Sequence, residues 1–153
     1  MLSNQILHKA VQDIKRITGL ECAIWDIKGI CLVMTNERMI GLEPEVTRFC
    51  ETAPSVAVEE TRFRIEKDMG MFLVHDDEDP CYILVLKGNC PHMEMAGRLG
   101  ISQLENLLFA YKEKMDKNRF IQNLILDNML LVDVYNQAKK MKIPVELRRV
   151  VFL

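Results

Sequence analysis

The sequence lacks the short motifs that mark common enzyme active sites. It has no GxSxG nucleophile motif, no P-loop, no HExxH and no dinucleotide-binding glycine fingerprint. Its three histidines, at positions 8, 75 and 92, belong to different predicted elements. No nucleophile–base pair or metal constellation can therefore be assembled from them. We predict that the chain is not an enzyme.

Cysteine is present in an odd number and without metal-binding spacing. The five cysteines, at positions 22, 31, 50, 81 and 90, include no CxxC pair. The acidic stretch His75–Asp79 lacks the alternating ligands and central glycine of a calcium loop, and it is typical of a solvated turn. We predict reduced cysteines packed as small apolar side chains, with no metal and no cofactor.

Long apolar runs are absent as well. No signal peptide is visible at the N-terminus, and polar residues interrupt each apolar run before it reaches the length of a membrane span. The formal net charge of −2 argues against a nucleic-acid surface. With 49% hydrophobic residues, the chain is expected to fold. We expect a soluble, cytoplasmic protein that does not contact a membrane.

What is present is an alternation of helix and strand patterns. Ser3 suits a helix N-cap and Gly19 a helix stop, and Asp26–Gly29 suits a hairpin turn. The order predicts an α+β fold with an antiparallel sheet and flanking helices, as in PAS-like, GAF-like or profilin-like sensors, and order alone does not separate these. The predicted strands are Cys22–Ile27, Ile30–Met34, Val56–Ile65, Gly70–Val74 and Cys81–Leu86, the last of them central, and a short helix is predicted over Glu45–Thr52.

A long helical pattern extends from about Pro91 to about Met141. Its apolar residues follow the 3-4 spacing of a coiled-coil seam, which predicts a homodimer through this C-terminal helix. The alternative is that the helix completes the core of a monomer. The predicted interface residues are Ile101, Leu104, Leu108, Tyr111 and Met115.

A ligand pocket is predicted between the sheet and the short helix after the first hairpin. Arg38 could bind a carboxylate through its planar guanidinium. Arg62 and Arg64 are two residues apart on a strand, so both should point to one face, either toward a dianionic ligand or toward solvent beside Glu60 and Glu66. Trp25 is either a stacking surface or a core residue. The candidate ligand-binding residues are Thr35, Asn36, Arg38, Arg62, Arg64 and Trp25.

The end of the chain resembles the start of a new domain. Val150–Leu153 is a continuous apolar run typical of a buried strand, which needs a neighbouring strand. We therefore predict a sensor domain over residues 1–90, a helical region for dimerisation and signal transmission over residues 91–141, and the truncated start of a following domain over residues 142–153.

Several segments resemble the carbohydrate (sugar) diacid regulator family of bacterial transcription factors. The resemblance spans nearly the whole chain and is strongest after Gly97. The segments that carry it are Leu2–Leu7, Trp25–Gly29, Lys112–Leu124, Leu131–Lys140, Ile143 and Arg149–Leu153.

The resemblance implies a regulator in which a sugar-diacid recognition domain is joined by a helix to a GGDEF-like regulator domain and then to a helix-turn-helix. DNA would be bound only by that C-terminal part, which this chain lacks. Arg38 and Gly41 match the family's Arg-Ile-Gly segment with one residue inserted, the following His is missing, and Glu43 and Glu45 would repel a dicarboxylate. A different small-molecule effector stays open.

Two hypotheses of function follow. In the first, the chain is a sensory module that binds a small carboxylate or sugar-diacid-like effector and changes the packing of its C-terminal helix. In the second, it is a ligand-free structural dimerisation module, as in roadblock-like or profilin-like scaffolds, and its core is filled.

Overall fold

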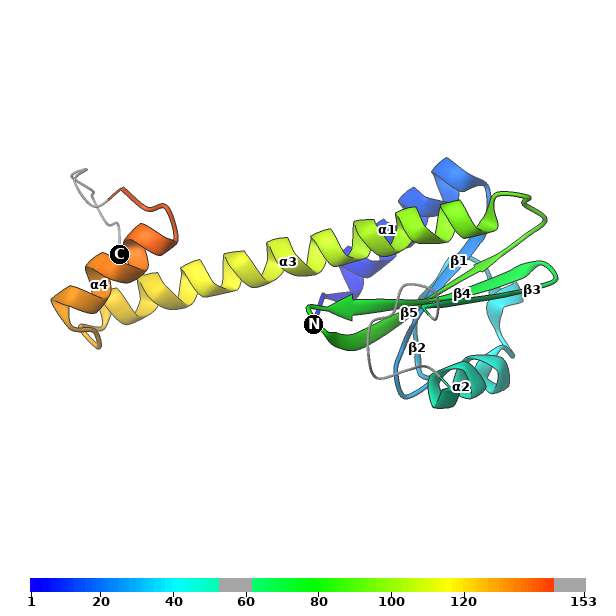
Figure 1. Cartoon of the computed structure of the whole chain (residues 1–153), viewed down its shortest axis with the longest axis horizontal. Coiled ribbons are helices and arrows are strands. Elements are labelled where there is room, and N and C mark those ends of the chain that lie inside the picture. The colour runs from blue at the N-terminus through cyan, green and yellow to red at the C-terminus, as the bar shows by residue number, and fades with distance from the viewer. Residues whose placement is uncertain (53–61, 145–153) are drawn as a thin grey trace. The chain divides into compact units, whose positions relative to one another are not determined.

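The computed structural model describes residues 1–52 and 62–144 of the chain. The backbone divides into two compact units, Met1–Phe109 and Ala110–Leu153. Figure 1 shows the elements, which confirm the predicted α+β class. They are α1 (Asn4–Thr18), β1 (Glu21–Asp26), β2 (Cys31–Met34), the 3-10 helix η1 (Glu37–Met39), α2 (Glu43–Thr52), β3 (Phe63–Glu66), β4 (Met69–Asp76), β5 (Asp79–Lys87), α3 (Met93–Ile125) and α4 (Leu131–Lys140).

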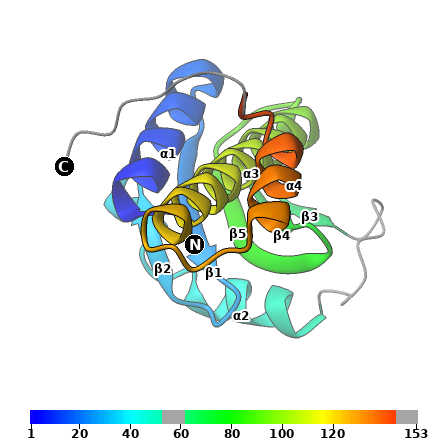
Figure 2. The same ribbon diagram turned by 90° about the vertical axis from the view of Figure 1, so that its left-hand side faces the viewer.

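The five strands form one antiparallel sheet in the order β2-β1-β5-β4-β3. Figure 2 shows the strands side by side in this order. The central position of β5 confirms the prediction drawn from its nearly continuous apolar sequence. Strands β2 and β3 are the two edges, so residues carried by these strands lie at opposite sides of the sheet.

Local signals explain the first helix and the first hairpin. The Ile6 N–H donates to the Ser3 hydroxyl oxygen (3.4 Å), and Gly19, with φ of 72°, closes α1 through a bond from its N–H to the Lys15 carbonyl. In the hairpin, one carboxylate oxygen of Asp26 accepts from the N–H groups of Lys28 and Ile30 at 2.9 and 2.8 Å. Both elements stand where the sequence predicts them.

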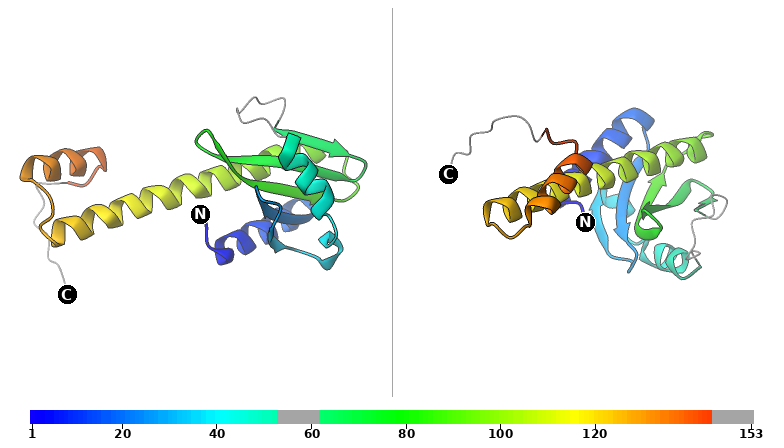
Figure 3. Two further views of the ribbon diagram at one scale, coloured as in Figure 1. Left: turned by 90° about the horizontal axis from the view of Figure 1, so that it is seen from below. Right: turned by 60° about the vertical axis from the view of Figure 1, so that its left-hand side comes forward.

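The two faces of the sheet are covered by different helices, as Figure 3 shows. Helix α1 and residues 93–109 of α3 cover one face, where Ile24, Phe72 and Leu84 form a register row across β1, β4 and β5. Helix α2 covers the other face, where Trp25, Leu73 and Ile83 form the next row. All six side chains are at most 2% exposed. Apolar residues that alternate along these strands therefore pack in two cores, one on each face of the sheet.

Two glycines let α3 lie close to the sheet. A Cβ on Gly97 would overlap the ring of Phe72, and one on Gly100 would lie 2.5 Å from Leu84 Cδ2. Both glycines are buried. Glycine inside a helix is unfavourable by about 1 kcal/mol relative to alanine, and here close packing gives the reason for it.

The start of α3 is buried in its own unit. Ile101, Leu104 and Leu108 are 7%, 0% and 5% exposed, because they face the sheet and α1. This corrects the predicted dimer seam for these three residues, since packing of their side chains occurs within the chain. Tyr111 and Met115 belong to the second unit, where Met115 is 45% exposed, and their place in a dimer stays a prediction.

The helical pattern from Pro91 to Met141 is interrupted, unlike the predicted continuous helix. Helix α3 ends at Ile125, and Asp127 adopts a φ of 55°. The N–H of Asn128 donates to the carbonyl of Asn123, and that of Asp127 to the carbonyl of Leu124. These two bonds form a Schellman motif, and Asp127 supports it because Asp tolerates the left-handed conformation better than most residues do. A separate helix, α4, then follows.

The compact units of the backbone can be compared with the predicted domain boundaries, which stay a prediction. The first compact unit extends to Phe109 and so includes the first half of α3, whereas the sequence places the sensor boundary at residue 90. The predicted strand Val150–Leu153 and residues 56–61 of the predicted third strand lie outside the described residues. Among the helices of the described ranges, none has the length and apolar character needed to cross a bilayer.

Candidate functional site

The predicted ligand-binding residues do not meet at one place. Thr35, Asn36 and Arg38 follow β2, whereas Arg62 and Arg64 belong to the β3 side of the sheet. These edge strands are four strand spacings apart, or roughly 19 Å. The structure therefore separates the predicted polar groups into two sets.

Thr35 and Asn36 of the first set form hydrogen bonds with nearby backbone N–H groups. The Thr35 hydroxyl donates to the Glu21 carboxylate (2.6 Å) and accepts from the Cys22 N–H (2.9 Å). The Asn36 side-chain oxygen accepts from the Arg38 N–H (3.0 Å) and caps η1. The bond from Thr35 and the ion pair with Lys15 lower the pKa of Glu21. The Arg38 side chain is exposed.

Trp25 lies in the core between the sheet and α2. Its side chain is 1% exposed and shares this core with Met39, Val46, Phe49 and Met71. Its indole Nε1 has no hydrogen-bond partner among the described residues. The position agrees with the core interpretation of this residue rather than with an open stacking surface.

Arg62 and Arg64 contact different helices, which contradicts their predicted placement on one face. The Arg64 guanidinium lies 5.8 Å from the ring centroid of Phe49 and donates to Thr52 Oγ1 (3.2 Å), both on α2. Arg62 Nη1 donates instead to Glu105 Oε1 on α3 (3.4 Å). Arg62 precedes the first residue of β3, so the alternation of side chains along the strand does not fix its direction.

Arg62 lies in a hollow between the β3 edge of the sheet and α3. The hollow has a volume of about 180 Å³. Arg98 covers the ring of Phe63 at 5.5 Å from its centroid, and Phe63 stacks in turn on Phe72. The hollow thus combines two guanidinium groups with an aromatic wall. Its lining residues are Arg62, Phe63, Arg98, Ile101, Ser102 and Glu105.

Glu105 joins α3 to β4 and to the residue that precedes β3. Its Oε1 accepts from the Arg62 guanidinium (3.4 Å) and from the backbone N–H of His75 on β4 (3.3 Å). The side chains of Arg62 and Glu105 are 23% and 32% exposed, so the pair is only partly screened by water. One carboxylate oxygen therefore holds the helix to the edge of the sheet.

Unpartnered polar atoms surround this contact. His75 is 3% exposed, and neither of its ring nitrogens has a hydrogen-bond partner among the described residues. The same holds for Nε of Arg62. Buried polar atoms usually have partners. Of these three nitrogens, Nε of Arg62 belongs to a residue that lines the hollow.

Burial and the nearby positive charge of Arg62 lower the pKa of His75, against the opposing effect of Glu105. We predict that acid destabilises the fold through this residue. The folded state keeps His75 neutral while the unfolded chain takes up a proton, so stability is complete above the ordinary pKa of 6.5 and falls as pH drops below it.

Urea unfolding at pH 7.5 and pH 5.5 measures this effect. The decrease in stability between the two pH values should shrink in His75→Phe and persist in His92→Gln, whose side chain is exposed. Equal decreases in the wild type and His75→Phe would show that other groups cause the acid sensitivity.

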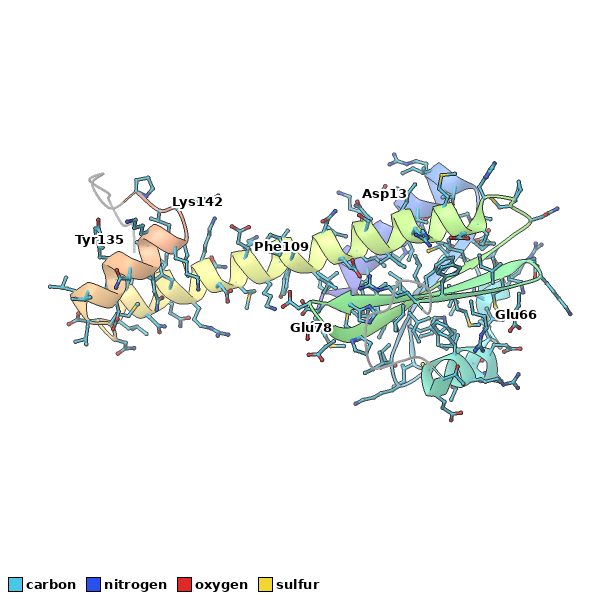
Figure 4. The ribbon with its side chains drawn as sticks, viewed as in Figure 1. Asp13, Glu66, Glu78, Phe109, Tyr135 and Lys142 are labelled. Carbon is cyan, nitrogen blue, oxygen red and sulfur yellow. The ribbon has the colours of Figure 1, made fainter. Side chains whose placement is uncertain are left out.

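Burial makes the thiols of four cysteines less acidic. All five are free. Burial raises the pKa of the Cys22, Cys31 and Cys50 thiols and raises that of Cys81 to about 12. Among the described residues, no group of three or more His, Cys, Asp or Glu side chains could hold a metal ion. Glu78, from the acidic stretch noted in the sequence, lies at the turn between β4 and β5 (Figure 4). The two guanidinium groups suit the hollow to binding anions.

Sequence reasoning identified Arg62 but missed Arg98, Ser102, Glu105 and His75. A helical signal existed, because residues 98, 101, 102 and 105 share one face of a helix. Nothing in the sequence indicates that this face lies beside β3.

Comparisons with protein-family models, with curated proteins and with solved structures find no match to this chain.

Proposed function

We propose that this chain is the sensory and dimerisation part of a bacterial transcription regulator. It binds a small carboxylate or sugar-diacid-like effector in the hollow between β3 and α3. The signal passes through α3 toward a helix-turn-helix DNA-binding domain. The family resemblance of the sequence supports the regulator class, and the hollow supports the ligand class.

The observation that carries the proposal is the pair Arg62 and Arg98 in one hollow. A guanidinium presents two parallel N–H donors to a carboxylate, and two guanidinium groups suit a molecule with two carboxylates. Phe63 gives the hollow an apolar wall against which a short carbon chain can pack.

Helix α3 forms one wall of the hollow through Arg98, Ser102 and Glu105. A ligand that favours one packing of this helix over another shifts the population of the two. Because α3 continues from the first compact unit into the second, its packing is a direct route for a signal.

Isothermal titration of the whole chain tests the proposal. We predict saturable binding, one molecule per chain, of glutarate, D-glucarate or galactarate, with neutral sugars as controls. Binding should weaken with added salt because the contacts are ionic. A flat response to the whole panel of small carboxylates would contradict small-molecule sensing.

A ligand-free dimerisation module is the second candidate. Two observations favour it: the core under α2 is filled, and the second unit exposes many large apolar side chains, which are typical of association surfaces. In this case the mass of the dimer, measured by light scattering, should not respond to any carboxylate. The exposed side chains are Met115, Ile121, Leu124, Ile125, Leu126, Leu130, Leu131, Val132 and Tyr135.

A further inference from the structure

The contact between Arg62 and Glu105 is weaker than the contact that Arg62 can make with a free carboxylate. A single donor, Nη1, reaches Glu105 Oε1 at 3.4 Å, beyond the usual range of about 2.7–2.9 Å for charge-assisted bonds. The Nε–H group has no partner among the described residues. Arg62 thus holds Glu105 with one donor, while a bidentate carboxylate would use two.

Arg98 is also available to a ligand. Its Nη2 pairs with Glu94 at 3.1 Å, one helical turn away, but both side chains are 52% exposed, so this pair is weak. Its guanidinium stacks on Phe63 at the mouth of the hollow. An anion entering here meets Arg98 first and Arg62 deeper inside.

We propose that the Glu105 carboxylate takes the place of a ligand carboxylate in the effector site. In the absence of ligand, its carboxylate holds Arg62. A small dicarboxylate binds Arg98 with one end and displaces Glu105 from Arg62 with the other, and this loosens α3 from the edge of the sheet. The inference rests on the proposed function, because it assumes that the hollow takes an anionic effector.

Displacement has a mechanical consequence because the oxygen that contacts Arg62 also accepts from the His75 N–H. When Glu105 moves away, α3 loses its side-chain bonds to both β4 and the segment that leads into β3. The apolar contacts of Leu104 and Leu108 remain. The helix therefore stays folded but opens more often, and its amides around residue 105 exchange faster.

The variant Glu105→Gln tests this inference with glutarate as the probe. Glutamine keeps the size and an oxygen acceptor for the His75 N–H but removes the charge that competes for Arg62. Glutarate should bind this variant roughly tenfold more tightly, which corresponds to about 1.4 kcal/mol. Glu113→Gln is the matched control, because it makes the same change on α3 outside the hollow, in the pair with Lys117.

Hydrogen exchange supplies an independent readout. Glutarate should speed exchange of the amides at 101–108 in the wild type. Glu105→Ala, which removes the bonds to both His75 and Arg62, should show the faster exchange without ligand. If glutarate binds the wild type and Glu105→Gln equally well, the displacement is wrong while the effector site stands. If neither protein binds any dicarboxylate, both the effector site and the displacement are wrong.

Discussion

Leu104→Lys is expected to unfold the unit Met1–Phe109 rather than only separate two subunits. Leu104 is 0% exposed and lies on α3 one turn after Gly100, facing the sheet. The change removes about 1.5–3 kcal/mol of apolar burial and places an ammonium group at a fully buried position. A loss of roughly 4 kcal/mol or more is comparable with the whole stability of a small domain.

Urea unfolding followed by the fluorescence of Trp25, the only tryptophan, measures this loss. Leu99→Lys is the matched control, because Leu99 lies on the same helix and is 65% exposed. Its effect should stay within about 0.5 kcal/mol. If Leu104→Lys left a fully folded monomer in place of a dimer, the packing of α3 on the sheet would be wrong and the predicted seam would be right.

The sequence was sufficient where the signals are local. Ser3, Asp26 and Gly19 act through bonds to residues within four positions of them, so the first helix and hairpin could be predicted closely. The nearly continuous apolar run of Cys81–Leu86 likewise indicated a central strand.

The sequence was insufficient where one pattern fits two partners. The 3-4 spacing of Ile101, Leu104 and Leu108 shows that one face of the helix is apolar, but a sheet can cover such a face as well as a second helix can. The glycines Gly97 and Gly100 were the missed clue, since they permit close approach to Phe72 and Leu84. The break at Asp127–Asn128 was missed because the apolar residues continue past it.

The candidate site depends on neighbours that are distant in sequence. Arg62 and Glu105 are 43 residues apart, and His75 contacts the same carboxylate from β4. The alternation rule predicted Arg62 and Arg64 on one face, but it applies only within a strand, and β3 begins at Phe63. The sheet order that brings β3 beside α3 cannot be obtained from the pattern of apolar residues.

Arg98→Gln is expected to remove most of the affinity for dicarboxylates. A charge-assisted hydrogen-bond pair to a carboxylate contributes about 1.5–3 kcal/mol, so affinity should fall roughly 10- to 150-fold. Arg98 is a cleaner target than Arg62, because the carboxylate that it pairs with, Glu94, is half exposed. Removing Arg62 would also leave Glu105 without its counter-charge.

Arg64→Gln provides the matched control for this change. Arg64 has the same charge and lies two residues from Arg62, but its guanidinium contacts Thr52 and Phe49 on α2. The control should bind dicarboxylates as the wild type does. It also separates the hollow beside α3 from the pocket that the sequence predicted beneath α2.

The most direct test of the account is therefore calorimetric titration of glutarate into three proteins: wild type, Arg98→Gln and Arg64→Gln. We predict that the wild type and Arg64→Gln bind with equal affinity, and that Arg98→Gln binds at least tenfold more weakly while remaining folded. If Arg64→Gln lost binding and Arg98→Gln kept it, the effector site would lie on the α2 face, and the hollow between β3 and α3 would not be the site.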